Sequence, residues 1–203
     1  NKQPEHWFIE GNFAKRMATG PQGNTSGDIT HSRGYVYGAG MAMPRELVLR
    51  IFKEKQLYLT DRKGKYLTGG GDMELCYIAR IEGYKIWYAD KLFFYHYMSD
   101  NRTTPTYLKK LSHGKAYSSI LLKPYEIVFN QDPLANKSFI WARLLIPKVR
   151  QLVKSLLNRP SNNKLENIRK EMAINSLIGS IESLIKHNFM IDQIVVDIKK
   201  QLN

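Results

Sequence analysis

The pattern of apolar and polar residues predicts two helices in the first half of the chain. In residues 45–56, Leu47, Ile51 and Phe52 lie on one face, and basic residues occupy the other. Residues 72–82 repeat this helical spacing. Gly83 follows them, at the position where a residue in the left-handed conformation commonly ends a helix. We therefore expect helices over both ranges.

Two short segments are predicted to be strands. Residues 34–43, "GYVYGAGMAM", have the alternation expected of a buried strand, and residues 84–89, "YKIWYA", are rich in residues that favour strands. The small residues Gly38, Ala39 and Gly40 would let another backbone segment or a ligand approach the first strand closely.

The second half of the chain has a continuous helical pattern. Thr104 and Pro105 are suited to begin a helix. Between residues 133 and 165 there is no Asp or Glu, and basic residues alternate with apolar ones over 137–159. This pattern predicts a basic amphipathic helix that is either kinked or restarted at Pro147. After a break at residues 160–163, two further helices are expected from the apolar positions Leu165, Ile168, Met172, Leu177, Ile181, Leu184, Ile191, Ile194, Val195 and Ile198.

The charge and the cysteine content limit the kinds of partner and cellular setting that fit this chain. The chain has 203 residues and a formal net charge of +13, which indicates an anionic partner such as a phosphorylated substrate, a phospholipid surface or nucleic acid. Its one cysteine, Cys76, excludes an intrachain disulfide and is expected to be a buried apolar residue. A reducing, cytoplasmic setting follows from this cysteine usage.

Asp72 is the most informative single residue. It follows three glycines at the predicted start of a helix. A carboxylate in this position either caps the helix or faces a cleft. Much earlier in the chain, residues 19–34, "TGPQGNTSGDITHSRG", are rich in glycine and small polar side chains. They predict a long loop, either a mobile loop near a site or a disordered segment.

Residues 68–88 resemble the acidic-pair motif of inverting family 2 glycosyltransferases with the GT-A fold. In that family a glycine-rich loop leads to Glu-Asp, then x-(Asp/Glu)-Leu, a helix, Gly-Tyr-(Lys/Arg)-Ile, a strand and a His. The sequence departs from the family at Gly71, where the first acid is expected, and the resemblance covers roughly residues 34–117. The matching positions are Asp72, Glu74, Leu75, Gly83, Tyr84, Lys85, Ile86 and His96.

The resemblance implies an α/β fold. Residues 1–130 would form a partial GT-A-like (Rossmann-like) sheet with flanking helices, and residues 131–203 a basic, amphipathic helical appendage. The sequence contains no Asp-x-Asp, and no nucleotide-binding βαβ unit precedes the loop. We therefore expect the C-terminal, acceptor-side portion of a glycosyltransferase, which would be inactive without its nucleotide-binding half.

The resemblance also implies roles for individual residues. Asp72 would be the general base that activates an acceptor hydroxyl, and His96 would complete a site for Mg²⁺ or Mn²⁺. The donor would be a nucleotide-diphosphate sugar, and the acceptor a glycan or lipid-linked molecule of cell-envelope polysaccharide synthesis. The expected substrate-binding residues are Gly38, Ala39, Gly40, Gly70, Gly71, Glu74, Lys109 and Lys115. Of these, Lys109 and Lys115 would lie over the donor diphosphate, unless they only form a solvated basic face of their helix.

Several alternatives remain open at this point. Glu74 either orients the acceptor or only interacts with the helix dipole. The helix over 137–159 either lies on an anionic membrane, at the inner face, or packs on another helix or subunit, giving a homo-oligomer. A non-catalytic basic helical module that binds a membrane surface, a protein or nucleic acid is the alternative function, although no motif for specific nucleic-acid recognition is visible.

Overall fold

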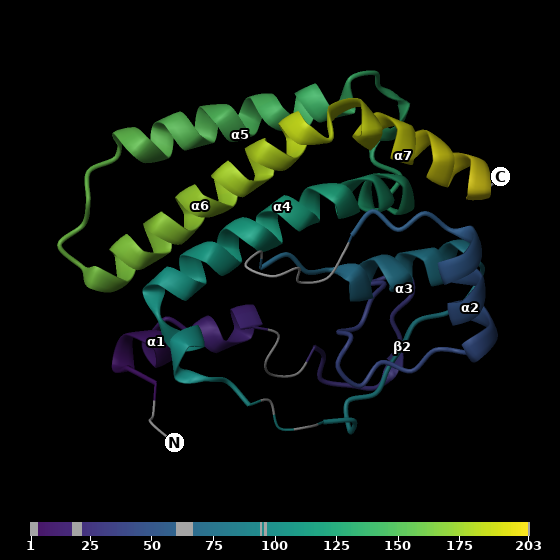
Figure 1. Cartoon of the computed structure of the whole chain (residues 1–203), viewed down its shortest axis with the longest axis horizontal. Coiled ribbons are helices and arrows are strands. Elements are labelled where there is room, and N and C mark those ends of the chain that lie inside the picture. The colour runs from purple at the N-terminus through teal and green to yellow at the C-terminus, as the bar shows by residue number, and fades with distance from the viewer. Residues whose placement is uncertain (1–3, 18–21, 60–66, 94, 96, 203) are drawn as a thin grey trace. The chain divides into compact units, whose positions relative to one another are not determined.

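The computed structural model describes residues 4–17, 22–59, 67–93, 95 and 97–202. It divides into two compact units (Figure 1). The first comprises Asn1–Tyr58 and Gly71–Thr104, and the second comprises Leu59–Gly70 and Pro105–Asn203. The sequence placed a boundary near residue 130, whereas here the helix that begins at Pro105 belongs with the C-terminal helices.

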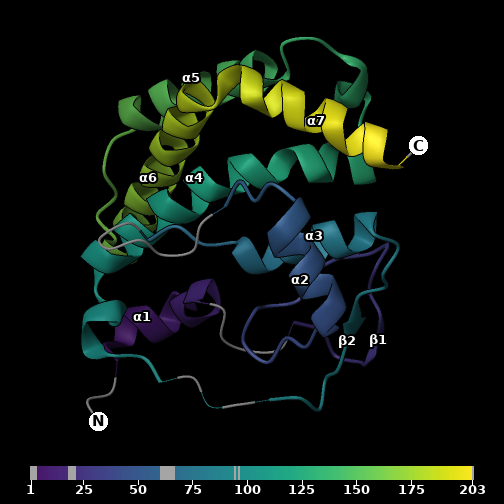
Figure 2. The same cartoon turned by 45° about the vertical axis from the view of Figure 1, so that its right-hand side comes forward.

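The first unit contains short elements joined by long connections. Its two strands, β1 and β2, can be followed in Figure 2. Single 3₁₀-helices lie at Phe13–Met17 and Asp100–Thr103. The other elements are α1 (His6–Glu10), β1 (Gly27–Asp28), α2 (Arg45–Glu54), α3 (Gly71–Ile81) and β2 (Trp87–Tyr88).

The predicted α/β fold with a partial Rossmann-like sheet is wrong. The sheet in the described residues has two strands, which pair antiparallel, with Gly27 opposite Tyr88 and Asp28 opposite Trp87. The segment over 84–89 thus forms a strand only at Trp87–Tyr88. Most of the described chain is helical, and the two-residue strands are too short to bury a helix layer.

Residues 34–43 do not form the predicted strand. Gly34 and Gly40 have φ angles of 73° and 77°, and the N–H of Met41 donates to the carbonyl oxygen of Gly38 at 3.2 Å. Left-handed backbone at two glycines interrupts the extended conformation and folds the segment into a turn. Gly38, Ala39 and Gly40 therefore lie in a loop and not in a strand.

Helices α2 and α3 form as predicted. Leu47 and Ile51 are buried, as expected for the apolar face of α2, whereas Phe52, predicted on the same face, is 64% exposed. Helix α3 ends with Gly83 at a φ of 83°, and the N–H groups of Gly83 and Tyr84 donate to carbonyl oxygens in the last turn. This pair of hydrogen bonds is a Schellman motif, which needs a left-handed residue.

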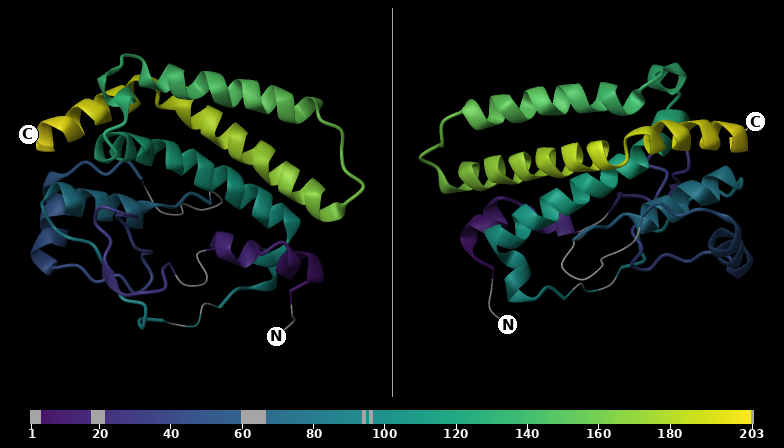
Figure 3. Two further views of the ribbon diagram at one scale, coloured as in Figure 1. Left: turned by 180° about the vertical axis from the view of Figure 1, so that it is seen from behind. Right: turned by 45° about the horizontal axis from the view of Figure 1, so that its top comes forward.

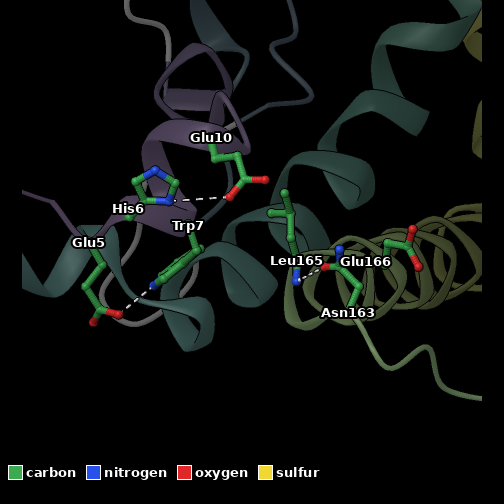
Figure 4. A network of polar contacts seen from close by, with 7 residues as sticks. All are labelled: Glu5, His6, Trp7, Glu10, Asn163, Leu165 and Glu166. Carbon is green, nitrogen blue, oxygen red and sulfur yellow. Dashed lines mark hydrogen bonds and ion pairs between the residues drawn. The ribbon is translucent and has the colours of Figure 1, made fainter.

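Local contacts order the N-terminal part of this unit. The rings of Trp7, Phe8 and Phe13 are buried against one another, and the indole N–H of Trp7 donates to Glu5 at 2.7 Å (Figure 4). Within the predicted loop, Arg33 donates to the carbonyl oxygen of Tyr35 at 2.9 Å and also to that of Gln22. The described part of this loop is therefore folded back on itself.

The second unit is a helical bundle (Figure 3). Helix α6 packs against both α4 and α5, and α7 contacts α4 and α5. Ile120, Ile140, Leu184 and Ile191 are among the residues of its core, so each of the four long helices contributes to it. The helices are α4 (Pro105–Phe129), α5 (Ile140–Leu157), α6 (Lys164–Lys186) and α7 (Asn188–Leu202), with a 3₁₀-helix at Pro133–Asn136.

The helix boundaries of this unit follow the sequence signals closely. Helix α4 begins at Pro105, and the break over 160–163 ends at Asn163. Helix α5 continues through Pro147, so the alternative of a restart at this residue is wrong. The side chain of Asn163 caps α6 by accepting from the N–H groups of Leu165 and Glu166 (Figure 4). Among the described residues, none of the helices has the length and apolar character needed to cross a membrane.

Candidate active site at the start of helix α3

Asp72 occupies the first turn of α3, and its carboxylate is held from two directions. Its Oδ1 accepts a hydrogen bond from the N–H of Met73 at 2.9 Å, and its Oδ2 accepts one from the N–H of Gly38 at 2.8 Å. Both donors are backbone groups, so their positions do not depend on side-chain rotamers. The N-terminus of the helix also favours the negative charge. The residue is half-buried, so that water or a substrate can reach the carboxylate.

The turn opposite Asp72 contains the three small residues predicted to bind substrate. Gly38, Ala39 and Gly40 are all exposed. A Cβ atom at Gly38 would lie 3.0 Å from the Cβ of Asp72, which is closer than side chains normally approach. The absence of a side chain at Gly38 therefore lets the Asp72 carboxylate reach the backbone of this turn. Sequence reasoning identified both residues but not their contact.

Glu74 lies two residues after Asp72 in the first turn of α3 but in a different environment. It is only 1% exposed, and its Oε1 accepts a hydrogen bond from the N–H of Tyr58 at 2.9 Å. A buried carboxylate needs such donors to offset its lost hydration. The role of Glu74 in orienting an acceptor stays a prediction, and the geometry gives it a structural contact that the sequence did not indicate.

Cys76 is buried beneath this site. Its Sγ lies 4.0 Å from the carbonyl oxygen of Val36 and 3.7 Å from the Sδ of Met41. Burial raises the pKa of the Cys76 thiol, and the nearby Asp72 carboxylate acts in the same direction. The thiol is therefore neutral at physiological pH, which agrees with the predicted packing role.

The remaining predicted substrate residues are divided between the two units. Gly71 is the first residue of α3, whereas Gly70, Lys109 and Lys115 belong to the second unit. There Gly70 has a φ of 104°, and a Cβ on it would contact Leu122 at 3.2 Å. The positive φ angle favours glycine at this position, and the nearby Leu122 side chain leaves little room for a Cβ atom.

The two predicted donor-binding lysines differ in environment. Lys109 of α4 forms an ion pair with Glu171 of α6, with 2.8 Å between Nζ and Oε2. Lys115 is exposed on the same helix. The contact to a diphosphate stays a prediction for both, and at Lys109 it would compete with Glu171.

The predicted metal ligand His96 lies outside the described residues. Within the ranges that are described, there is no group of three or more His, Cys, Asp and Glu side chains arranged to hold a metal ion. The Asp-x-Asp that would supply the other ligands is missing from the sequence. The described residues thus do not fit a Mg²⁺ or Mn²⁺ site, and no chemical step is assigned to a metal.

Comparisons with known proteins do not indicate a function for this chain. The chain matches no model of a protein family, no curated protein sequence and no solved structure. The case for a function consequently depends on the motif around Asp72 and on the geometry of its carboxylate.

Proposed function

We propose that this chain is the acceptor-side part of an inverting glycosyltransferase of the family 2 type, with Asp72 as its general base. The donor is a nucleotide-diphosphate sugar, and the acceptor is a hydroxyl of a glycan or of a lipid-linked molecule. One observation carries the proposal. The half-buried carboxylate of Asp72 is held at the start of α3 by backbone N–H groups of Gly38 and Met73.

The proposed reaction is a single displacement at the anomeric carbon of the donor sugar. The acceptor oxygen forms a bond to this carbon while the bond from the carbon to the diphosphate oxygen breaks, and the diphosphate leaves with the electron pair. The proton of the acceptor hydroxyl passes to an Asp72 carboxylate oxygen. Because attack and departure take place on opposite faces, the configuration at the anomeric carbon inverts.

The geometry suits a general base because such a group must be positioned before the proton moves. Each carboxylate oxygen can accept about two hydrogen bonds, so the bonds from Gly38 and Met73 leave capacity for an acceptor hydroxyl. The two backbone donors also limit rotation of the carboxylate. Holding the reacting groups in line reduces the entropy that the reaction must otherwise lose at the transition state.

The departing diphosphate needs positive charge to stabilise it. The sequence contains no Asp-x-Asp. We therefore propose that residues outside these 203 supply the nucleotide-binding half and that the chain alone does not catalyse transfer. Addition of donor and acceptor to the purified 203-residue chain should release no nucleoside diphosphate.

The test is Asp72→Asn in the natural full-length protein, assayed with a set of nucleotide-diphosphate sugars for release of nucleoside diphosphate. The amide keeps the shape of the side chain but does not take up the proton, so kcat should fall by about a hundredfold or more. Donor binding, measured by calorimetry, should remain unchanged. NMR of the product should show an inverted anomeric centre.

Asp28→Asn is the matched control, since Asp28 belongs to the same unit and its carboxylate accepts from the N–H of Thr30 at 2.9 Å. This variant should retain transfer. Full activity of the Asp72→Asn protein, or no transfer by the wild-type protein from any nucleotide sugar, would show that Asp72 is only a structural residue.

A further inference from the structure

Helix α5 leaves an apolar stripe uncovered on the second unit. Ile146, Val149, Val153 and Leu156 are 52%, 41%, 51% and 62% exposed, and Leu157 is 79% exposed. Their spacing of three and four residues places them along one side of the helix. The stripe extends over about 16 Å of the helix axis. The opposite side of α5 packs on α6 and α7.

Basic side chains lie directly beside this stripe. Arg143, Arg150 and Lys154 are exposed, and their positions in the helix place them together along one edge of the apolar stripe. The helix contains no acidic residue. The fourth cation of the helix, Lys148, is half-buried and faces the bundle, where burial and the neighbouring Lys123 lower its pKa. The exposed side of α5 thus combines aliphatic and cationic groups.

Two aromatic rings extend the apolar surface at the start of α5. Phe139, which precedes the helix, is 59% exposed, and Phe189 of α7 is 61% exposed. Their ring centroids are 6.3 Å apart. Phe189 also contacts Trp141, with 5.8 Å between the centroids. Aromatic side chains are favourable where an apolar acyl region meets polar headgroups.

We propose that α5 docks this protein on the surface of an anionic lipid bilayer. Ile146, Val149, Val153, Leu156 and Leu157 enter the boundary between headgroups and acyl chains, with α5 lying in the plane of the surface. Arg143, Arg150 and Lys154 contact the lipid phosphates. The charge of α5 favours an anionic bilayer as the binding partner, because the cations along the stripe complement an anionic surface. The proposal does not depend on sugar transfer.

Other occupants are less compatible with the same observations. A second copy of α5 packed antiparallel on the stripe would bring Arg143, Arg150 and Lys154 close to identical charges, which repel one another when the stripe is buried. Nucleic acid offers phosphates for the cations but no apolar layer for the five aliphatic side chains. A bilayer surface provides partners for both kinds of side chain in adjacent layers.

The experiment is flotation of the full 203-residue chain with vesicles of phosphatidylcholine alone and of phosphatidylcholine mixed with phosphatidylglycerol. The wild-type chain should float with the anionic vesicles and less with the neutral ones. The double variant Val149→Gln, Val153→Gln should bind about tenfold more weakly, since two exposed aliphatic groups no longer enter the lipid. Arg143→Gln, Arg150→Gln and Lys154→Gln combined should weaken binding about a hundredfold.

Leu49→Gln is the matched control for the loss of an apolar side chain. Leu49 is 52% exposed on α2, a helix that carries both acidic and basic residues. Because this residue is not on α5, the Leu49→Gln variant should bind vesicles as strongly as the wild type does. Circular dichroism of every variant checks that the helices remain folded. The proposal is overturned if the wild-type chain fails to float with anionic vesicles. It is also overturned if the valine variant floats as well as the wild type, or if light scattering shows that the wild-type chain is a dimer and the valine variant a monomer.

Discussion

The Oδ2 atom of Asp72 accepts a hydrogen bond from the backbone N–H of Gly38 at 2.8 Å, across 34 positions of sequence. The contact depends on the missing side chain of Gly38, because a Cβ atom there would lie 3.0 Å from the Cβ of Asp72. The same glycine therefore both donates to the carboxylate and leaves room for it. A change at Gly38 should act on the geometry of Asp72 more than on the fold.

Gly38→Ala should displace the Asp72 carboxylate by a few tenths of an ångström. The extra methyl group should cost about 1 kcal/mol of unfolding free energy. If Asp72 is the base, kcat of the full-length protein should fall more than this small loss of stability explains. Gly27→Ala is the control, because a Cβ there meets nothing within 4 Å. Equal activity of both variants would argue that the position of Asp72 does not matter for transfer.

Glu74→Ala should destabilise the first unit by about 2 kcal/mol, because the N–H of Tyr58 loses its acceptor and a cavity remains. Denaturation with urea measures the change. Glu46→Ala, at an exposed position in the first turn of α2, should have little effect. A full-length Glu74→Ala protein with unchanged stability and a raised KM for the acceptor would instead support a role in substrate binding.

Gly179→Ala should destabilise the bundle, although alanine is the better helix former by about 1 kcal/mol. A Cβ at Gly179 of α6 would lie 2.3 Å from the carbonyl oxygen of His113 in α4, so the two helices would have to move apart. We expect a net loss of about 2 kcal/mol in thermal unfolding followed by circular dichroism.

The opposite substitution on the same helix provides the control for Gly179. Ala173→Gly, at an exposed position, should cost only the propensity difference of about 1 kcal/mol. If Gly179→Ala stabilised the protein instead, the close contact between Gly179 of α6 and His113 of α4 would not exist in solution.

The pKa of His187 predicts a loss of stability in mild acid. Burial lowers this pKa, and the neighbouring Lys186 lowers it further, while the ring contacts the hydroxyl of Tyr117 at 2.9 Å. Because the folded-state pKa lies below the unfolded value of about 6.5, the unfolded chain binds the additional proton between the two. Stability is therefore complete above the unfolded pKa and decreases as the pH falls through that interval.

His187→Gln should reduce this dependence, because glutamine does not titrate. The melting temperatures of both proteins are compared from about pH 7.5 down to about pH 5, across the unfolded pKa of histidine. The wild type should lose more stability than the variant over this range. Parallel curves would indicate that His187 titrates equally in both states.

The helices and their ends were predictable because their signals are local. The apolar positions of α6 and α7, Asn163 before α6 and Gly83 after α3 all act within one or two turns of their own helix. The sheet was not predictable in this way. Residues 34–43 have the composition of a strand, but a strand needs partners from distant segments, and left-handed glycines fold this segment into a turn.

The candidate site shows the same division. The sequence by itself determined that a carboxylate stands at the start of a helix after a glycine run, that the chain is strongly basic, and that α5 carries aliphatic and cationic residues. Only the tertiary structure decided that Asp72 meets Gly38, that Glu74 is buried against Tyr58, and that the aliphatic side of α5 stays exposed. Periodicity defines the faces of a helix, but which face is covered depends on packing with segments far away in the chain.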